Sequence, residues 1–232
     1  MITTILLDYG NVLAYPKSGH WFLPPDTKKI VGLGTYVKFA ANYGKLEAAF
    51  KTAKKYLDDN HMLRTEEEEL AQFTEFYRLF ANEMGAKVTP EICEKLAHDA
   101  VFNDSAKVFY PDVLSGITAL KAKYKVGVLS DTWPSLRRLL TNAGIAPHLD
   151  TLVMSCDHGI TKESPRLFEI AVEAVGKNPE NILFVDDTES NLQNAKAVGL
   201  KPVLMDRDGK CTTSDFPIIR TLGEISAIAE KS

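Results

Sequence analysis

The spacing of apolar residues divides the chain into two regions of different character. From about Pro24 to about Phe102, apolar residues recur three and four positions apart, as in KLEAAFKTAKKYLDDN (45–60) and TEEEELAQFTEFYRLFANEMG (65–85). This spacing predicts amphipathic helices. From Tyr110 onward, short apolar runs alternate with amphipathic stretches, which predicts strands separated by helices.

Five short apolar runs predict buried strands. They are TTILLD (3–8), KVGVLS (125–130), TLVMS (151–155), NILFVD (181–186) and KPVLM (201–205). Continuous rather than alternating apolar residues are typical of parallel strands that are covered on both faces. The helices between these strands are expected to begin near Pro111, Pro134, Pro165 and Thr188.

The order of these elements predicts the fold class. Within the helical region, Thr65 with Glu68 predicts a helix start, Gly85 its end, and Thr89–Pro90 the start of another helix. The first strand precedes this region and the other four follow it, so the helical region is an insertion. We therefore predict an α/β fold, a doubly wound (Rossmann-like) parallel sheet with an inserted α-helical cap domain. Residues 1–16 and 103–232 would form the core domain, and residues 17–102 the cap.

Composition and charge narrow the possible partners. The 232 residues are 45% hydrophobic with a net charge of −4, which does not favour nucleic-acid binding. The first apolar run is interrupted too early to cross a bilayer, and it lacks the features of a secretory signal. Three scattered cysteines, Cys93, Cys156 and Cys211, have no metal-binding spacing. We expect a cytoplasmic protein without nucleic-acid or membrane partners, and its oligomeric state stays open.

Polar residues follow four of the predicted strands. Asp8 ends the first, Ser130 and Asp131 follow the second, Lys162 lies in the loop after the third, and Asp186 and Asp187 follow the fourth. In doubly wound folds, ligands bind at the carboxyl ends of the strands. These residues should therefore meet at one edge of the sheet.

The chemistry of this set indicates a metal-assisted phosphoryl transfer. Carboxylates packed together require a cation, and oxygen ligands of this kind suit Mg²⁺ completed by a phosphate. A lysine and a hydroxyl would face the remaining phosphate oxygens. A carboxylate in line with the phosphorus can act as a nucleophile through an aspartyl-phosphate.

Four ordered motifs resemble the haloacid dehalogenase (HAD) superfamily, in the branch whose helical cap follows the first strand. They are LLDYGNV, VGVLSDT, GITKESPRLFEIA and ILFVDDTESNLQNAKAVGL, and they cover nearly the whole chain. The resemblance implies a nucleophile, a phosphate hydrogen-bond donor, a phosphate-binding lysine and a set of metal ligands. The nucleophile would be Asp8, the phosphate hydrogen-bond donor Ser130 and the phosphate-binding lysine Lys162. The metal ligands would be Asp8, Asp186, Asp187 and the carbonyl of Gly10.

Two departures from the family pattern bear on function. Glu163 and Ser164 follow Lys162 where the family usually has Pro and Asp, which changes a loop. More seriously, Gly10 stands where family phosphatases carry a second Asp that protonates the leaving group. General acid–base help is typically worth about 10²–10⁴-fold in rate. Asp131, which we include among the substrate-binding residues because it adjoins Ser130, is the nearby candidate to replace it.

The missing acid favours substrates with good leaving groups. Anomeric, acyl or aryl phosphates need less protonation than primary alcohol phosphates. The D-x-G-N-V form of the first motif also resembles a subgroup regarded as sugar-phosphate phosphatases. We therefore expect a phosphatase that acts on a small phosphorylated metabolite, with a sugar phosphate as one candidate.

Two other functions stay open. A 2-haloacid dehalogenase-like hydrolase would use the same nucleophile on carbon, although the adjacent Asp186 and Asp187 would then have no metal to bind. A catalytically silent HAD fold used in binding or regulation is the other possibility. Structural explanations exist too, since Ser130 could cap the helix near Pro134 and Lys162 could be a solvated loop residue.

Overall fold

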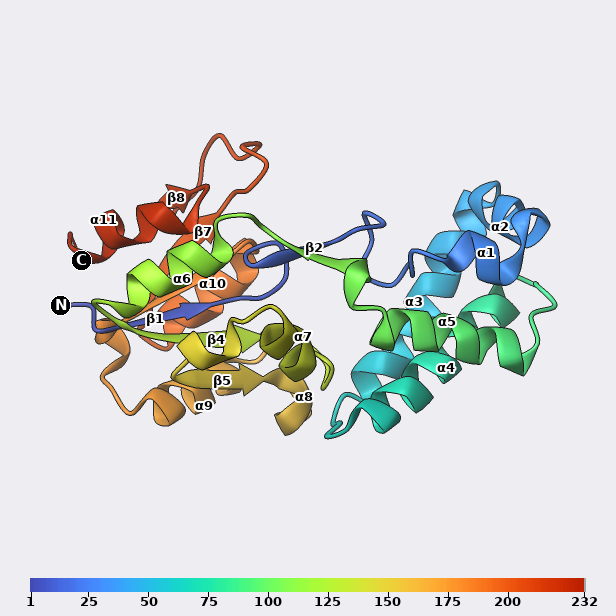
Figure 1. The fold of residues 1–232 in the computed structure, drawn as a ribbon, viewed down its shortest axis with the longest axis horizontal. Coiled ribbons are helices and arrows are strands. Elements are labelled where there is room, and N and C mark those ends of the chain that lie inside the picture. Colours follow the sequence, from blue (N-terminus) through green and yellow to red (C-terminus); the bar gives the residue numbers. More distant parts are fainter. Residues whose placement is uncertain (232) are drawn as a thin grey trace. The chain divides into compact units, whose positions relative to one another are not determined.

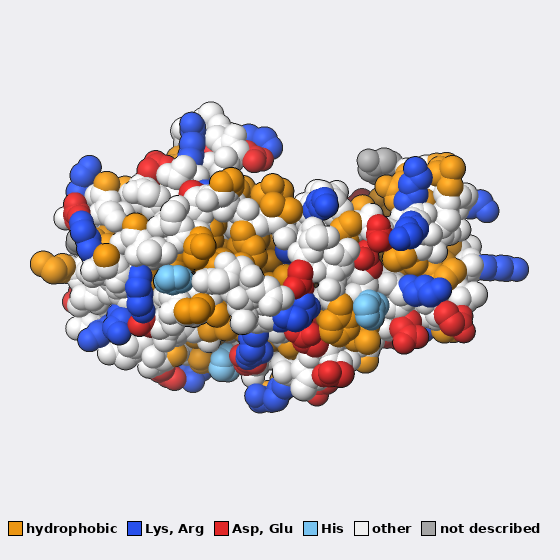
Figure 2. Space-filling model, viewed as in Figure 1, with side chains coloured by type: hydrophobic (Ala, Val, Ile, Leu, Met, Phe, Trp, Pro, Cys, Tyr) orange, Lys and Arg blue, Asp and Glu red, His pale blue; other side chains and the backbone are white. Residues whose placement is uncertain are grey.

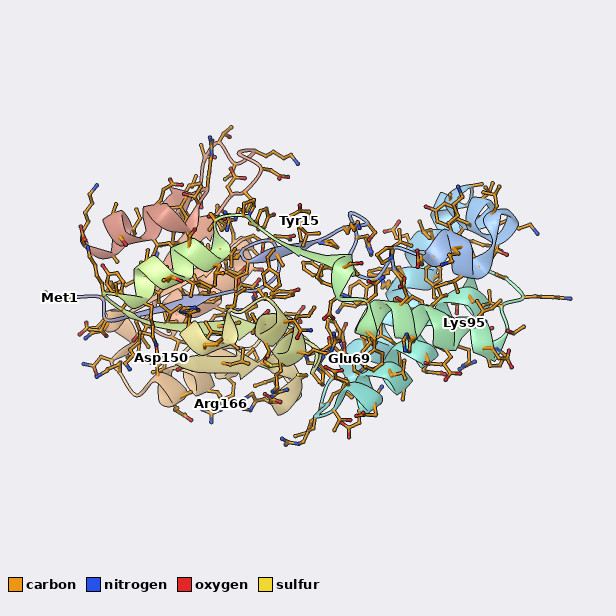
Figure 3. All side chains as sticks on the ribbon, in the orientation of Figure 1. Met1, Tyr15, Glu69, Lys95, Asp150 and Arg166 are labelled. Atoms are coloured by element: carbon orange, nitrogen blue, oxygen red, sulfur yellow. The ribbon has the colours of Figure 1, made fainter. Side chains whose placement is uncertain are left out.

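The chain forms two compact units, each described here by itself. The computed structural model describes residues 1–231, apart from the side chain of Tyr43. The α/β unit contains Met1–Tyr15 and the residues from Phe109 onward, and the helical unit contains Pro16–Val108. Asp150 and Arg166 lie in the first unit, and Glu69 and Lys95 in the second (Figure 3). The expected cap, residues 17–102, starts one residue later and ends six residues earlier than the helical unit.

The α/β unit is built on a parallel sheet of six strands (Figure 1). Its spatial order is β5-β4-β1-β6-β7-β8, and each neighbouring pair is parallel. The strands are β1 (Thr4–Leu7), β4 (Lys125–Ser130), β5 (Thr151–Met154), β6 (Ile182–Asp186), β7 (Lys201–Met205) and β8 (Ile218–Ile219). The predicted doubly wound α/β fold and its five strands are confirmed, and the two-residue β8 was not predicted.

The strand order reverses beside β1. After β1 the chain adds β4 and then β5 on one side of β1. It then crosses to the other side of β1 and adds β6, β7 and β8 in that order. Leu6 pairs with Gly127 of β4 and with Phe184 of β6, so β1 is an inner strand. A Cβ on Gly127 would lie 2.9 Å from Leu6 Cδ2 and 2.8 Å from the Thr151 carbonyl, so only glycine fits there. Ligands bind at such a reversal, which here lies between the carboxyl ends of β1 and β6.

Helices cover the sheet and bury its apolar side chains. They are α6 (Val113–Lys121), α7 (Leu136–Asn142), α8 (Ser155–His158), α9 (Pro165–Val175), α10 (Glu189–Ala197) and α11 (Ile225–Ala229), with short 3₁₀ turns at Ala146–His148, Pro179–Asn181 and Leu222–Glu224. Phe168 of α9 packs edge-on against Phe184 of β6, with ring centroids 5.3 Å apart. Helices α9 and α10 begin within a residue of the expected positions, whereas α6 and α7 begin two residues after their prolines.

The helical unit contains α1 (Thr27–Val31), α2 (Leu33–Ala40), α3 (Tyr43–Asp59), α4 (Glu66–Glu83), α5 (Pro90–Phe102) and a 3₁₀ turn (Asp104–Ala106). The predicted start of α4 is confirmed, because Thr65 and Glu68 form a reciprocal capping box. Gly85 follows α4 in the left-handed conformation (φ 66°), as a terminating glycine should. Phe73, Phe76 and Tyr77 of α4 are buried and form much of the core of this unit.

Two short strands carry the chain out of the α/β unit and back. β2 (Ala14–Pro16) and β3 (Lys107–Phe109) pair in a small separate sheet. Near it, the rings of Tyr15, labelled in Figure 3, and Tyr110 lie 4.9 Å apart.

Charged side chains of both signs lie on the surface of the protein. Figure 2 shows positive and negative side chains interspersed over the displayed face. Among residues 1–231, none of the helices combines the length and hydrophobicity needed to span a membrane.

Candidate active site

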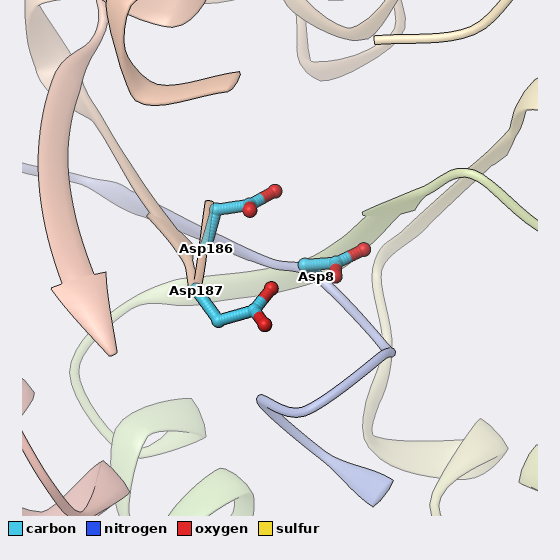
Figure 4. A group of neighbouring side chains, drawn as sticks. All are labelled: Asp8, Asp186 and Asp187. Carbon is cyan, nitrogen blue, oxygen red and sulfur yellow. The ribbon is translucent and has the colours of Figure 1, made fainter. Parts of the chain in front are cut away.

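Asp8 lies directly beyond the end of β1, where the strand order reverses. Its backbone N–H donates to the carbonyl of Val185 in β6 (2.9 Å), which continues the pairing of the two strands by one residue. Its side chain is buried, with the residue only 5% exposed. Figure 4 shows that the carboxylates of Asp8, Asp186 and Asp187 extend from the ends of β1 and β6 into a common space.

Lys162 joins two of these carboxylates. Its Nζ lies 2.8 Å from Oδ1 of Asp8 and 2.6 Å from Oδ2 of Asp186, and the residue is 2% exposed. Lys162 lies in the loop between α8 and α9, and both its backbone N–H and its carbonyl form hydrogen bonds to side chains. The N–H of Lys162 donates to Oδ1 of Asp131 (2.9 Å), and its carbonyl accepts from Nδ2 of Asn194 (2.8 Å). A solvated loop position for Lys162 is therefore excluded.

Asp186 is oriented by the beginning of α10. Oδ1 of Asp186 accepts from the backbone N–H of Thr188 (2.8 Å), and both of its carboxylate oxygens accept from Nδ2 of Asn191 (3.1 and 3.2 Å). Because Asp186 is fully buried, these donors and Lys162 replace the water that its charge would otherwise need.

Asp187 is held by the turn that follows Asp8. Nδ2 of Asn11 donates to Oδ2 of Asp187 (2.8 Å), and the hydroxyl of Thr188 lies 3.3 Å from Oδ1. Asn11 has a φ of 54°, a left-handed conformation that asparagine adopts more readily than most residues. This turn thus brings together the ends of β1 and β6.

Burial and like charges disfavour full ionisation of this cluster. Burial, with the nearby charge of Asp186, raises the pKa of Asp8 to about 7 even though Lys162 opposes the change. Burial likewise raises the pKa of Asp187, against the effect of the Asn11 hydrogen bond. Burial disfavours the charged form of Lys162, but Asp8 and Asp186 outweigh it and raise the pKa of the lysine, so it stays charged.

The three carboxylates fit a divalent cation. One ligand oxygen from each of Asp8, Asp186 and Asp187 lies within 4.8 Å of the others. A set made only of oxygen ligands, with more negative charge than Lys162 can balance, suits a hard ion such as Mg²⁺.

The other expected site residues lie at the same edge of the sheet but outside this network. Ser130 ends β4 and is 1% exposed, and its Oγ lies 3.4 Å from the carbonyl of Asp131, so it does not cap α7, whose N-cap is Ser135. Gly10 forms an isolated bridge with Ala14 in the turn after Asp8. Among the described residues, no hydrogen bond or ion pair joins Ser130 or Gly10 to the three carboxylates.

Asn11, Thr188, Asn191 and Asn194 contact the site residues but were not predicted as part of the site. Asn11 and Asn191 donate to Asp187 and Asp186 respectively. Asn11 follows Gly10, where a turn residue tolerant of positive φ could have been recognised. Asn191 lies in the first turn of α10, five positions after Asp186, where its side chain can return to the strand end.

Comparison with known proteins identifies the family. The family model described as haloacid dehalogenase-like hydrolase matches residues 2–199. Phosphoserine phosphatase from Thermus thermophilus is 30% identical over 122 residues, which are 51% of this chain and 49% of that protein. For the first curated relatives, the matched part spans only 24% to 56% of their length.

Two solved structures share the fold over almost their entire length. L-2-haloacid dehalogenase from Xanthobacter autotrophicus, with chloropropionic acid covalently bound, has a TM-score of 0.67 at 17% identity and covers 99% of each chain. The HAD-hydrolase YfnB from Bacillus subtilis, bound to magnesium, has a TM-score of 0.61 at 16% identity and covers 98% of each chain. At these identities the likeness concerns the fold.

Proposed function

The chain belongs to the haloacid dehalogenase-like hydrolases, and from this membership we propose that it is a Mg²⁺-dependent phosphatase of a small phosphorylated metabolite. The observation that best supports this proposal is the cluster of charged groups at the strand ends. Lys162 contacts both Asp8 and Asp186, and one carboxylate oxygen from each of Asp8, Asp186 and Asp187 lies within 4.8 Å of the others. Positive groups such as Mg²⁺ and the Lys162 ammonium group reduce the repulsion between a dianionic phosphate and a carboxylate nucleophile.

Asp8 is the proposed nucleophile. In the first step, a carboxylate oxygen of Asp8 forms a bond to phosphorus, and the bond from phosphorus to the ester oxygen breaks. The alcohol leaves with the electron pair of that bond and takes a proton from solvent water or from Asp131, the candidate acid. In the second step, water attacks the aspartyl-phosphate and the bond between phosphorus and Asp8 breaks. Inorganic phosphate and the carboxylate are released, and one proton of the attacking water returns to the group that supplied the proton in the first step.

The neighbouring residues have distinct proposed roles. Lys162 keeps its positive charge and neutralises the phosphate oxygens, and the Ser130 hydroxyl donates a hydrogen bond to them. Asp8, Asp186, Asp187 and the carbonyl of Gly10 would hold Mg²⁺. When bound, the metal supplies positive charge that stabilises the phosphoryl group in the transition state.

The residue at position 10 favours substrates that need little protonation. Gly10 has no side chain to protonate the leaving oxygen, so a hexose 1-phosphate should react faster than a hexose 6-phosphate. Asp131 is the candidate acid, since it lies next to Ser130 at the end of β4. Its Oδ1 accepts from the backbone N–H of Lys162, which fixes its position at the strand ends.

A panel of phosphate esters tests this function. Purified wild type with Mg²⁺ would be assayed for phosphate release beside Asp8→Asn, on hexose 1-phosphates, hexose 6-phosphates and an aryl phosphate. We expect turnover by the wild type, loss of activity in Asp8→Asn, and faster release from the 1-phosphates. Equal rates for the two sugar phosphates would refute the leaving-group preference, and equally inert proteins would favour a binding or regulatory role.

Dehalogenation is the second candidate, because Gly10 leaves the site without a second acid. This reaction would use Asp8 on carbon and would not need Asp187 as a metal ligand. Halide release from 2-haloacids that persists in excess EDTA would support it. Phosphate release abolished by EDTA and restored by Mg²⁺ would exclude it as the main activity.

A further inference from the structure

The helical unit contains a cavity of about 580 Å³ that the proposed reaction does not use. All of its lining residues lie between positions 20 and 96, within the helical unit. The walls include aromatic rings from three helices and the loop before them: Phe22, Phe39, Phe50, Phe76 and Phe80. Phe22 and Phe50 pack edge-on with centroids 5.4 Å apart, and Phe76 packs against both of them.

The size and lining of this cavity suit a small organic molecule. Ligand pockets in proteins typically enclose about 300–1,000 Å³ and are lined mainly by apolar and aromatic side chains. Water would find few hydrogen-bonding partners against these rings, so an apolar body in the cavity would stabilise the unit. Helix α2, which contributes Tyr36 and Phe39 to the wall, has no buried residue of its own, so space on its inner side is open to a ligand.

The charge of the lining selects against an anion. Glu47 is the charged residue in the described lining, which contains no lysine or arginine, and no ion pair of Glu47 is present among the described residues. Nδ1 of His20 accepts from the N–H of Phe22 (3.3 Å), and partial desolvation lowers the pKa of the imidazole, so both effects favour its neutral form. Burial raises the pKa of Tyr77, another lining residue, so its phenol is neutral.

We propose that this cavity binds an apolar amine. The aromatic or aliphatic body of the amine fills the cavity, and its ammonium group pairs with Glu47. Aromatic faces attract an organic cation in addition to the carboxylate, and the attraction increases when the cation is partly desolvated. This ligand differs in charge from the phosphate ester proposed for the α/β unit, so the two sites can be tested independently.

Three naphthalene derivatives of similar shape test the proposal by isothermal titration calorimetry on the full chain. They are 1-naphthalenemethylamine, which is cationic at pH 7, neutral 1-naphthalenemethanol and anionic 1-naphthaleneacetate. We expect the amine to bind about tenfold more tightly than the alcohol, and the acetate to bind most weakly. If none of the three binds, the site is refuted. If the acetate binds as well as the amine, the proposed charge preference is wrong.

Two pairs of variants locate the binding. Ala40 and Ala41 are adjacent exposed alanines, but only Ala40 is in the lining. We expect Ala40→Trp to abolish amine binding and Ala41→Trp to retain it. Glu47→Gln should remove the advantage of the amine over the alcohol, whereas Glu83→Gln, an exposed residue outside the lining, should leave it unchanged. Circular-dichroism melts would confirm folding, and unaltered binding in folded Ala40→Trp would refute the site.

Discussion

Asp8 is surrounded by groups that affect its protonation in opposite directions. Burial and the nearby carboxylates favour its neutral form, whereas Lys162, at 2.8 Å, favours its charged form. A bound cation would shift this balance toward the charged nucleophile. The charged form of Asp8 that the proposed reaction requires would therefore be favoured by a bound cation, in addition to any effect of that cation on the substrate.

The stability of the metal-free protein should reflect this shift. The pKa of Asp8 is about 7 in the folded state against 3.8 for the free side chain, so folding favours the protonated form. The stabilisation of the folded protein by protonated Asp8 is complete below pH 4 and is lost as the pH rises through 7. In EDTA, Asp8→Asn should therefore be more stabilising at pH 8 than at pH 5, by about 2 kcal/mol.

Urea unfolding at the two pH values measures this difference. Asp215→Asn is the control, because Asp215 is an exposed carboxylate. A stability difference between wild type and Asp8→Asn that is the same at both pH values would show that the pKa of Asp8 is not raised by folding.

Restoring an acid at position 10 tests the leaving-group hypothesis directly. The backbone of Gly10 lies outside the left-handed region, so an L-residue can occupy it. Gly10→Asp should raise the rate on a hexose 6-phosphate by about 10- to 100-fold and change the rate on an aryl phosphate little. Gly10→Asn is the matched control without an acid. Equal gains on both substrates would indicate a role other than protonation.

Much of the site could be predicted, because one geometric rule governs it. Asp8, Asp186 and Asp187 all follow parallel strands, so the strand assignment was enough to bring them together. The partners of these carboxylates depend on side-chain directions in a turn and at a helix start. Strand patterns do not contain that information, so Asn11 and Asn191 were not predicted.

Individual helices differ in how firmly their ends are fixed. The Thr65 hydroxyl accepts from the Glu68 N–H (3.2 Å), and the Glu68 carboxylate accepts from the Thr65 N–H (3.1 Å). At the start of α5, in contrast, Thr89 forms no capping hydrogen bond to the backbone through its side chain. Two threonines with the same position relative to their helices therefore differ in what they stabilise.

Substitution of these threonines should show the difference. Thr65→Ala should lower the free energy of unfolding by about 1 kcal/mol, because it leaves a backbone donor of α4 without its partner. Thr89→Ala, the matched control, should cost clearly less. The measurement is denaturant unfolding followed by circular dichroism, and equal losses in the two variants would contradict the assigned role of the capping box.

Long strands could be predicted from the sequence, whereas very short strands could not. The five strands of four to six residues have apolar runs long enough to recognise, whereas β8 has two residues and β2 and β3 three each. Pairing in these short strands comes from their neighbours rather than from their own composition. Helices α6 and α7 begin two residues beyond Pro111 and Pro134, because each proline begins a turn that precedes the helix.

In the whole molecule, the proposed metal site belongs to one unit. Its carboxylates lie in the segments 1–15 and 109–231, and none comes from the helical unit. Mg²⁺ should therefore slow hydrogen exchange of backbone amides around residues 8–12 and 186–191 more than in α4.

Hydrogen-exchange mass spectrometry with and without Mg²⁺ tests this localisation. Asp187→Asn is the control, because it removes one proposed ligand and should reduce the protection. Protection spread equally over α4, or unchanged in Asp187→Asn, would argue against a metal held by these carboxylates.

The position of β1 has a consequence for synthesis of the chain. Thr4 pairs with Lys125 and with Ile182, so the central strand is made first and its two partners are made long afterwards. Leu6 and Leu7, fully buried in the finished protein, have no sheet to join while the ribosome is producing the helical insertion. The helical unit can assemble during this interval, whereas Asp8 can pair with Lys162 only after residue 162 has emerged.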